Sequence, residues 1–355
     1  MSVDQYDVDV NRYSENEIRE FMTTMFMDGM GTTEEECEVL SEGLLTACYW
    51  WHPGQGQGLE KFFRLTAQVA NGGINVGAKI ETLKEGAGFA LLNANKAFGY
   101  VAAARAMDLA CEKAKENGVA GVGVCQSNHF GIAGYHAYRA AKQGMIGISM
   151  TNALAEMAPW GAKDPVLGTN PWGIAVPRKN AEPVVLDMAL TMSGVGMIRW
   201  FAREGREVPI DWALTPDGRQ TTDPEELEGG TQLPIGKYKG YGLSLMTDII
   251  SGVMTGSLFG TDVFQDLANH DVGSFVIAIN PEKFMDRHTF YDRLEVLLDQ
   301  VKSAEPIEPG DEILLPGEME LRRKAERQKN GIPIDKNTVA KLREIAAGLD
   351  VPCNL

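Results

Sequence analysis

The stretch that decides the fold reads Val122-Gly123-Val124-Cys125-Gln126-Ser127-Asn128-His129-Phe130-Gly131. It passes from an apolar run, typical of a buried strand, into a polar turn, and His129 in that turn is one of only five histidines in the chain. Ligands of open α/β sheets bind at the carboxyl ends of strands, and an imidazole is the usual group for proton transfer near neutral pH. His129 is therefore a candidate catalytic residue. The local pattern leaves open that it only caps a helix beginning near Gly131.

Helices and strands are predicted to alternate on both sides of this stretch. A long amphipathic helix over 98–116 ends at Asn117-Gly118, a typical helix stop, and a strand over 121–125 follows. The same kind of pattern predicts further strands at 146–150, 184–188 and 274–279, and a helix over 242–254. This alternation favours an α/β sheet covered by helices.

The two ends of the chain are predicted to be mainly helical. Capping boxes, Ser14 with Glu17 and Thr33 with Glu36, predict that helices begin there and run over 14–28 and 33–48. A glycine-rich loop over 50–59 follows. Near the carboxyl end, an irregular proline-containing segment over 305–317 precedes predicted helices at 318–329 and 337–347.

Composition restricts the class of protein. The chain has 355 residues, 44% of them apolar, which is enough for one large α/β domain or two ordinary ones. A net charge of -16 with scattered basic residues argues against a nucleic-acid partner. The five cysteines include no Cys-x-x-Cys spacing, which argues against a disulfide framework and a structural zinc site. Without a signal pattern at residues 1–13 or an apolar run of about 18 residues, we expect a cytoplasmic protein with no membrane partner.

Several familiar sites are absent or weak. No Gly-x-Gly-x-x-Gly follows a predicted strand, and residues 72–79 lack the lysine and hydroxyl order of a phosphate loop. His129 and His136 have a spacing that would suit a metal, but acidic partners at ligand spacing are missing, so we expect no metal. We expect His136 to be an ordinary packed or surface residue, and His270 and His288 to lie on the surface.

Two further segments are candidates for ligand contact. Asp187 ends the apolar run 183–189, where burial could shift its pKa, although a helix cap is the commoner role for such an aspartate. The turn 236–242 is basic and interrupted by glycines, which suits close backbone approach to a phosphate or carboxylate. Alternatively, this turn is only a flexible segment that precedes the next helix.

Together these stretches resemble the type-2 malate/lactate dehydrogenase family of non-Rossmann nicotinamide oxidoreductases, and most closely its 2,3-diketo-L-gulonate reductase branch. The segments that carry the resemblance are Asn128-His129, MAPWGAK at 157–163, GTNP at 168–171, LDMA at 186–189, YKGYG at 238–242 and LPGE at 315–318. The resemblance implies a homodimer with a three-layer α/β/α core and a mixed sheet. It also implies a helical part at 1–78 that packs with helices of 285–355, around a cofactor-binding core at 79–284.

The resemblance also implies the contacts of a nicotinamide cofactor, NAD or NADP, and the catalytic role of His129. His129 matches the family position for proton transfer between a 2-oxo acid and its 2-hydroxy acid. The sequence does not distinguish the two cofactors or identify the substrate. The positions that match the cofactor contacts are Pro183, Val184, Val185, Leu186, Asp187, Met188, Ala189, Tyr238, Lys239, Gly317, Glu318 and Met319.

The chain departs from the family at a second motif. The family carries Ser-His-Gly with an arginine four residues after the histidine, and the matching positions here hold Gln57 and Lys61. A lysine keeps the positive charge but not the rigid two-pronged contact of a guanidinium, and a glutamine donates no acidic proton. Either His129 works alone while Gln57 hydrogen-bonds the substrate, which we prefer, or His52 moves into the vacated place. The candidate substrate contacts are Gln57, Lys61, His52 and Asn152.

Three functions stay open at this point. The first is a reductase or dehydrogenase for 2-oxo and 2-hydroxy acids, with Lys61 holding the acid group. The second is a reductase of C=N bonds on the same scaffold, which needs less from a strong acid. The third is a non-catalytic relative that binds a nucleotide, since both family residues are replaced. Candidates for the walls of the pocket are Trp50, Trp51, His52, Trp160 and Trp172.

Overall fold

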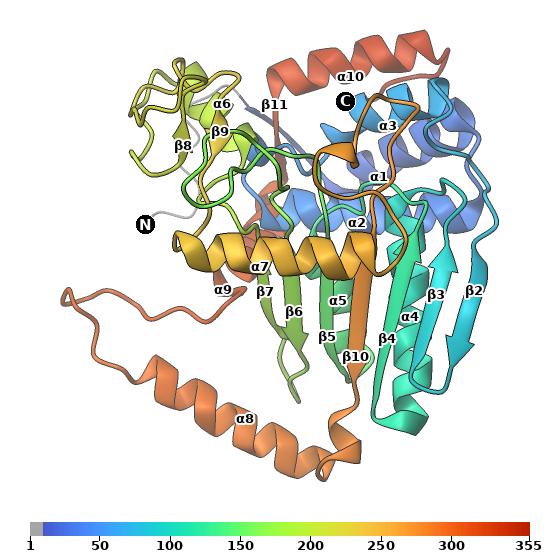
Figure 1. Cartoon of the computed structure of the whole chain (residues 1–355), viewed down its shortest axis with the longest axis vertical. Coiled ribbons are helices and arrows are strands. Elements are labelled where there is room, and N and C mark those ends of the chain that lie inside the picture. The colour runs from blue at the N-terminus through green and yellow to red at the C-terminus, as the bar shows by residue number, and fades with distance from the viewer. Residues whose placement is uncertain (1–9) are drawn as a thin grey trace.

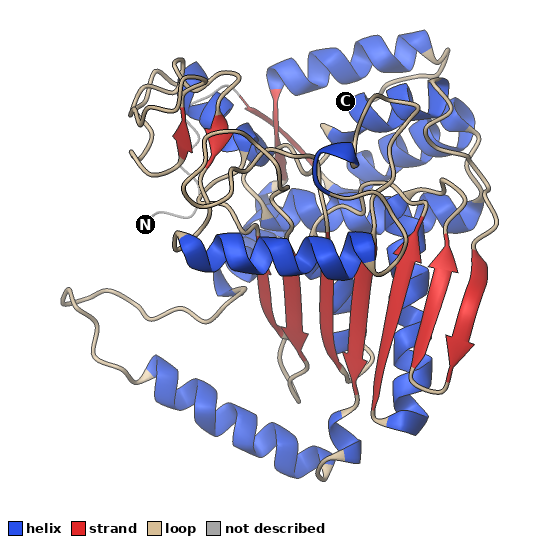
Figure 2. Cartoon of the chain, viewed as in Figure 1, coloured by secondary structure: helices blue, strands red, loops and turns tan. Residues whose placement is uncertain are grey.

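The computed structural model describes residues 10–355, and its centre is a seven-stranded mixed sheet (Figures 1 and 2). β3 and β4 pair in parallel, and every other neighbouring pair is antiparallel. It follows that β3, β4, β5 and β7 run in the same direction and end at one edge of the sheet. In spatial order the strands are β2 (Glu81–Gly86), β3 (Phe89–Asn93), β4 (Val119–Cys125), β10 (Ser274–Ile279), β5 (Ile146–Thr151), β6 (Trp172–Val176) and β7 (Val184–Met188).

Helices lie on both faces of this sheet. α4 (Gly99–Asn117) and α5 (Ala133–Ala141) cover one face, and α7 (Tyr238–Asp248), extended by a π-helical turn at Ile249–Val253, crosses the other (Figure 1). Small residues let α5 pack closely: a Cβ added at Gly173 in β6 would lie 2.4 Å from the backbone of Ala133. The predicted α/β class with a mixed sheet is confirmed.

A second layer of helices joins the two ends of the chain. β1 (Val10–Tyr13) pairs with β11 (Ile332–Asp335), α2 packs against α9, and α3 packs against α10. Both predicted capping boxes are present, at Ser14 and at Thr33. The division of the chain at 78 and 285 stays a prediction. The helices of this layer are α1 (Glu15–Thr23) with its π-helical turn Thr24–Gly29, α2 (Glu34–Trp50), α3 (Lys61–Ala70), α9 (Glu318–Asn330) and α10 (Lys336–Gly348).

One helix stands apart from both layers. α8 (Arg287–Lys302) extends away from the sheet (Figure 1), and Leu298 is its only buried residue. A two-pronged ion pair between Arg178 and Glu295 ties it to the loop between β6 and β7. The segment between β7 and α7 forms a small separate unit with α6 (Val195–Arg203), β8 (Ala213–Leu214) and β9 (Thr231–Gln232).

Candidate active site

The topology brings the predicted residues to one edge of the sheet. His129 follows β4, Asn152 follows β5, and Asp187 is the last residue but one of β7. Because these three strands run in the same direction, their carboxyl ends meet at the edge that faces α2 and α3 (Figure 1).

His129 lies partly buried in the turn between β4 and α5. Its Nδ1 accepts the N–H of Gly131 at 3.0 Å, so the neutral ring carries its proton on Nε2. The helix-cap alternative is wrong, since α5 begins at Ala133 without a side-chain cap. Burial lowers the pKa of His129 well below its ordinary value, and the nearby charges of Lys61 and Arg64 lower it further. The ring is therefore neutral at neutral pH in the protein without ligand.

Asn128, the neighbour of His129, fixes this turn. Its buried amide donates to the carbonyl oxygens of Gly73 and Ala97, and its Oδ1 contacts Nε2 of His270. The expectation that His270 lies on the surface is wrong. Its side chain is buried because the loop that carries it folds back onto α3, where Gln68 lies 2.8 Å away.

Two of the remaining three histidines lie where the sequence predicted them. His136 is packed in the core, where its Nε2 contacts the carbonyl oxygen of Phe130 at 2.7 Å. His288 is exposed at the start of α8. Within residues 10–355, no group of three or more His, Cys, Asp or Glu side chains is arranged to hold a metal ion.

α3 turns a row of polar side chains toward His129. Lys61, Arg64 and Gln68 have the spacing of one helix face, and Gln68 reaches Asn128 at 3.5 Å. Sequence reasoning missed Arg64, although its place one turn after Lys61 would have revealed it once α3 was recognised. In the part of the chain that the structure describes, neither the Lys61 nor the Arg64 head group has an ion pair or a hydrogen bond.

The glycine-rich loop before α3 carries the remaining candidates. Gln57 has a buried Oε1 without a partner among the described residues. His52 accepts the N–H of Gly54 on its Nδ1, and its ring packs edge-on against Trp200 of α6 with 4.6 Å between the ring centroids. To take the place of Gln57, His52 would have to leave both contacts.

Asn152 is engaged with the backbone. Its Oδ1 accepts the N–H of Gly273 at 2.9 Å, and its Nδ2 donates to the carbonyl oxygen of Leu258 at 2.8 Å. A substrate would have to compete with these bonds. Of the tryptophans predicted to line the pocket, Trp160 is exposed and Trp172 donates to Thr247 of α7.

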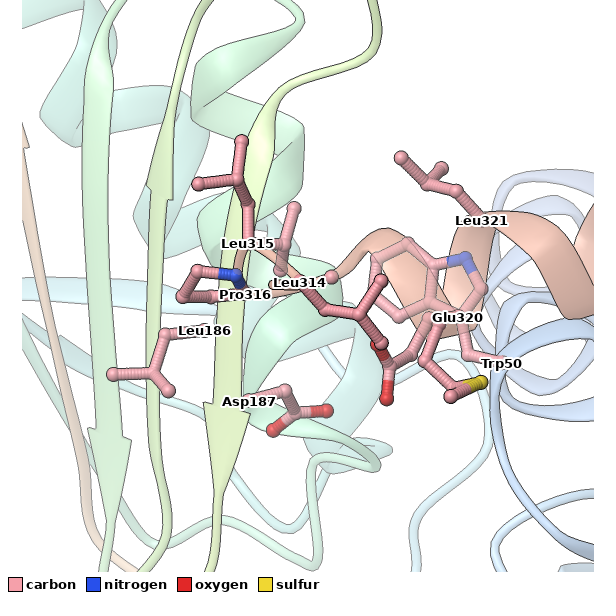
Figure 3. A pocket seen from close by; sticks show the side chains of 11 residues that line it. Trp50, Leu186, Asp187, Leu314, Leu315, Pro316, Glu320 and Leu321 are labelled. Carbon is pink, nitrogen blue, oxygen red and sulfur yellow. The ribbon is translucent and has the colours of Figure 1, made fainter. Parts of the chain in front are cut away.

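A cavity of about 350 Å³ opens beside β7 (Figure 3). Asp187 points into it, and its Oδ2 accepts Nε1–H of Trp51 at 3.3 Å. Burial raises the pKa of Asp187 to about 7, although this hydrogen bond and the N–H of Gly134 oppose the shift. The walls are formed by Trp50, Val185, Leu186, Leu314, Leu315, Pro316, Gly317, Met319, Glu320 and Leu321.

The three segments predicted to contact the cofactor all touch β7 or its continuation. The N–H of Val185 donates to Pro316, which places the turn at Gly317 beside the strand. Beyond the strand, Leu190 accepts the N–H of Ile235, which leads into α7 with Tyr238 and Lys239 exposed at its start. Glu318 faces away from the cavity, since its carboxylate accepts the N–H of Leu315 and pairs with Lys302.

These surroundings fit a nicotinamide cofactor. The apolar walls of the cavity suit a flat ring, while the exposed Tyr238 ring and the lysines at 237 and 239 suit an adenine and its phosphates. No helix within residues 10–355 is both long and apolar enough for a membrane span.

The fold and this site define an α/β enzyme with a histidine at a strand end, two unpaired cations beside it and a cavity along the neighbouring strand. The sequence model for malate/L-lactate dehydrogenase matches residues 13–343. The chain belongs to this family. As a member it is an oxidoreductase that acts on CH–OH or C=O groups, and that chemistry implies a nicotinamide cofactor.

Two curated relatives span nearly the whole chain. A malate dehydrogenase of Pyrococcus abyssi is 37% identical over 91% of each chain. A 2,3-diketo-L-gulonate reductase of Mannheimia succiniciproducens is 33% identical over 88% of this chain and 92% of its own.

Solved structures agree with the fold. A malate dehydrogenase from Entamoeba histolytica superposes with a TM-score of 0.91 at 30% identity, covering 98% of this chain and all of its own. A delta1-piperideine-2-carboxylate reductase from Pseudomonas syringae superposes with a TM-score of 0.82 at 29% identity, covering 95% of this chain and all of its own.

Proposed function

We propose that this protein interconverts a 2-oxo acid, or a diketo sugar acid, and its 2-hydroxy acid, with NAD or NADP as the hydride carrier and His129 as the proton donor and acceptor. The observation that carries the proposal is the pair of unpaired cations, Lys61 and Arg64, beside His129 at the strand end. Partly buried cations usually have a carboxylate partner in proteins, so this pair suits an acidic ligand.

The bound cofactor would supply or accept a hydride at the substrate carbon. The Nε2–H of neutral His129 would donate a hydrogen bond to the substrate oxygen, since its Nδ1 already accepts the N–H of Gly131. In reduction, the imidazolium form, which carries a second proton on Nδ1 and has released the N–H of Gly131, gives its Nε2 proton to the oxygen that is becoming an alkoxide. In oxidation, Nε2 of the resulting Nδ1–H tautomer takes the proton back. An acid group beside Lys61 and Arg64 offsets the charges that depress the pKa of His129, so substrate binding favours its protonation.

We assign the cofactor to the cavity along β7. It would be held by β7 with its flanking residues, Pro183 to Ala189, by Tyr238-Lys239 at the start of α7 and by the turn Gly317–Met319. Support comes from the hydrogen bonds that bring all three segments together and from the apolar walls of the cavity. Both NAD and NADP suit these residues.

The proposal gives the proton step to His129 alone, with Gln57 hydrogen-bonding the substrate. Its support is that His52 is already held by Gly54 and Trp200. His52→Ala should therefore reduce kcat by less than about tenfold, whereas His129→Ala should reduce it by about a hundredfold or more. Equal losses in the two variants would contradict the assignment.

The decisive experiment follows oxidation of the reduced cofactor with a panel of 2-oxo acids, a diketo sugar acid and a cyclic imine acid, for wild type and His129→Ala. Cofactor binding, measured by quenching of tryptophan fluorescence, should survive the substitution because His129 lies outside the cavity lining. Unchanged turnover in the variant would refute the role of His129. Cofactor binding by wild type without turnover of any substrate would identify a non-catalytic relative.

Reduction of a C=N bond is the second candidate. The neutral state of His129 favours it, because a cyclic imine that enters as its iminium ion already carries the proton that a ketone must receive. The similarity to the piperideine carboxylate reductase supports including such a substrate. Retention of imine reduction in His129→Ala, with loss of oxo-acid reduction, would favour this candidate.

We also propose that the active protein is a cytoplasmic homodimer. α7 and α8 expose many apolar side chains, which a second copy of the chain would cover. The five cysteines are all free thiols, which is usual in a reducing compartment. The exposed apolar residues of these helices include Leu243, Met246, Ile249, Val296, Leu297 and Val301.

A further inference from the structure

Arg64 lies one helical turn beyond Lys61 in α3 and faces the loop that carries His129. The row Lys61, Arg64 and Gln68 is held in place at its far end, where Nε2 of Gln68 lies 2.8 Å from Nε2 of His270 and 3.5 Å from Oδ1 of Asn128. Since Asn128 directly precedes His129, this contact turns the whole row toward the imidazole. The charge of Arg64 reaches His129, which agrees with that placement.

An aromatic ring holds the guanidinium of Arg64. The central carbon of the group lies 4.9 Å from the centroid of the Phe264 ring, and that ring in turn packs against His270 at 5.6 Å. Stacking on an aromatic face fixes a guanidinium while leaving its N–H groups at the edge available. Among the residues that the structure describes, none gives Lys61 comparable support, and Lys61 offers a single ammonium on a flexible stem.

In the described part of the chain, the edge of this guanidinium meets no acceptor. Nε of Arg64 is buried without a partner among residues 10–355, and the carboxylate of Glu156, whose charge reaches Arg64, instead accepts a hydrogen bond from Gln232 at 3.2 Å. Two other partly buried arginines of this chain, Arg139 and Arg178, each form a two-pronged pair with a carboxylate. The guanidinium of Arg64 is held in one position and could form such a pair, but no carboxylate of the described residues binds it.

We propose that Arg64 makes the directed, two-pronged contact with the carboxylate of the substrate, while Lys61 at the family's arginine position contributes only its charge. This inference rests on the proposed function, because it names the residue that selects an acid for the same site. Arg64 thus supplies, from the next turn of α3, the guanidinium that the Lys61 position lacks.

The experiment compares Arg64→Gln, Arg64→Lys and Lys61→Gln with wild type. The substrates are the best acid of the panel and its methyl ester, which lacks the negative charge. For the acid, Arg64→Gln should raise KM by about 10- to 100-fold, and Arg64→Lys by several-fold, because a point charge replaces the fork. For the ester, kcat/KM of the Arg64 variants should stay close to that of wild type. If Arg64 had only a structural role, its substitution would lower kcat/KM for the acid and the ester alike.

Binding of oxamate, an unreactive analogue of a 2-oxo acid, provides a readout that does not need turnover. It should raise the unfolding temperature of wild type most, that of Lys61→Gln somewhat less because one charge is lost, and that of Arg64→Gln least. Arg105→Gln, a change of an exposed arginine on α4, is the matched control and should behave as wild type.

The outcomes separate this inference from the proposed function. If Arg64→Gln keeps the wild-type KM for the acid, or if Lys61→Gln loses more affinity than Arg64→Gln, the inference is overturned while the oxidoreductase function stands. If wild type reduces no acid but oxamate still stabilises it in an Arg64-dependent way, the acid site stands and the proposed reaction fails.

Discussion

The surroundings of Lys61 disfavour its charged form. Burial, and then the charge of Arg64, lower its pKa from 10.5 to about 8. The ammonium form of Lys61 therefore prevails below about pH 8 and is lost above it. Above that pH an acid substrate should bind less well, because the site has lost one positive charge. We predict that kcat/KM for the acid substrate falls as the pH rises through about 8. The measurement is a pH profile of initial rates.

The variant Lys61→Arg tests the cause of that fall. An arginine stays protonated throughout the accessible range, so the alkaline decline should move to a pH higher by about one unit or more. An unmoved decline would assign the titration to another group.

Asp187 gives a prediction for stability. Burial raises its pKa from 3.8 to about 7 in the folded protein, so the folded state binds a proton more tightly than the unfolded state. Its contribution to the free energy of unfolding therefore falls as the pH rises from about 4 to about 7 and is constant above that. Asp187→Asn removes this loss and keeps an acceptor for Trp51. The difference in unfolding free energy between variant and wild type should grow in favour of the variant over this window, as measured by urea unfolding without cofactor.

An advantage of Asp187→Asn that stays equal at about pH 5 and about pH 8 would contradict the raised pKa. The carboxylates of Glu312 and Glu318 are a useful contrast because ion pairing keeps the pKa of both low. Their substitution should have the opposite dependence on pH.

At the scale of single residues, the sequence could reveal His129 and Asp187 because each ends an apolar strand pattern. It did not reveal Arg64, since α3 was not predicted, nor the burial of His270. The importance of Arg64 depends on the packing of α3 against the loop that carries Phe264, two segments about two hundred positions apart. His270 lies in a polar segment and is buried only because that loop closes onto Gln68.

At the scale of elements, α6 packs against the glycine-rich loop that carries Gln57. A Cβ added at Gly54 would lie 2.6 Å from the ring of Trp200, which is buried. We predict that Gly54→Ala pushes the loop with Gln57 out of place, lowers the free energy of unfolding by about 1–3 kcal/mol and raises KM. Urea unfolding and initial rates measure both effects.

The matched control is Gly348→Ala at the exposed end of α10, where nothing lies within 4 Å of an added Cβ. It should change the free energy of unfolding by no more than about 0.5 kcal/mol. Should Gly54→Ala be equally mild, the ring of Trp200 is not what fixes the loop.

Elements with strong local signals were predictable, and others were not. β7 and β10 have the predicted bounds, and the capping boxes placed α1 and α2. β2 was missed because all but one of its residues are exposed and charged or polar residues dominate it. α3 was missed because it follows a glycine-rich stretch without a side-chain cap. The predicted helix at 14–28 changes to a π-helical turn from Thr24 onward, which apolar periodicity does not reveal.

At the scale of the whole molecule, the position of α8 requires an explanation. Burial of apolar surface normally holds a helix to its protein, yet Val296, Leu297 and Val301 of α8 are all exposed. A helix held mainly by ion pairs at Glu295, in its middle, and at Lys302, its last residue, would not keep this position against solvent unless another surface covered it. α7 offers a second exposed apolar surface on the open face of the sheet, and a two-fold arrangement would allow α8 of each copy to cover part of the other.

We therefore predict that the protein elutes as a dimer in size-exclusion chromatography with light scattering, and that Leu297→Glu on α8 shifts it toward the monomer. A buried charge opposite an apolar partner surface disfavours association, whereas on an isolated α8 the change would be harmless. Ile210→Glu, which places the same charge on an exposed apolar residue between α6 and β8, is the control and should leave the dimer intact. A monomeric wild type would show that α8 is stable without a partner, and a dimer that survives Leu297→Glu would place the interface elsewhere. The far-ultraviolet circular dichroism of the variant should match wild type, since the substituted side chain is already 55% exposed in the single chain.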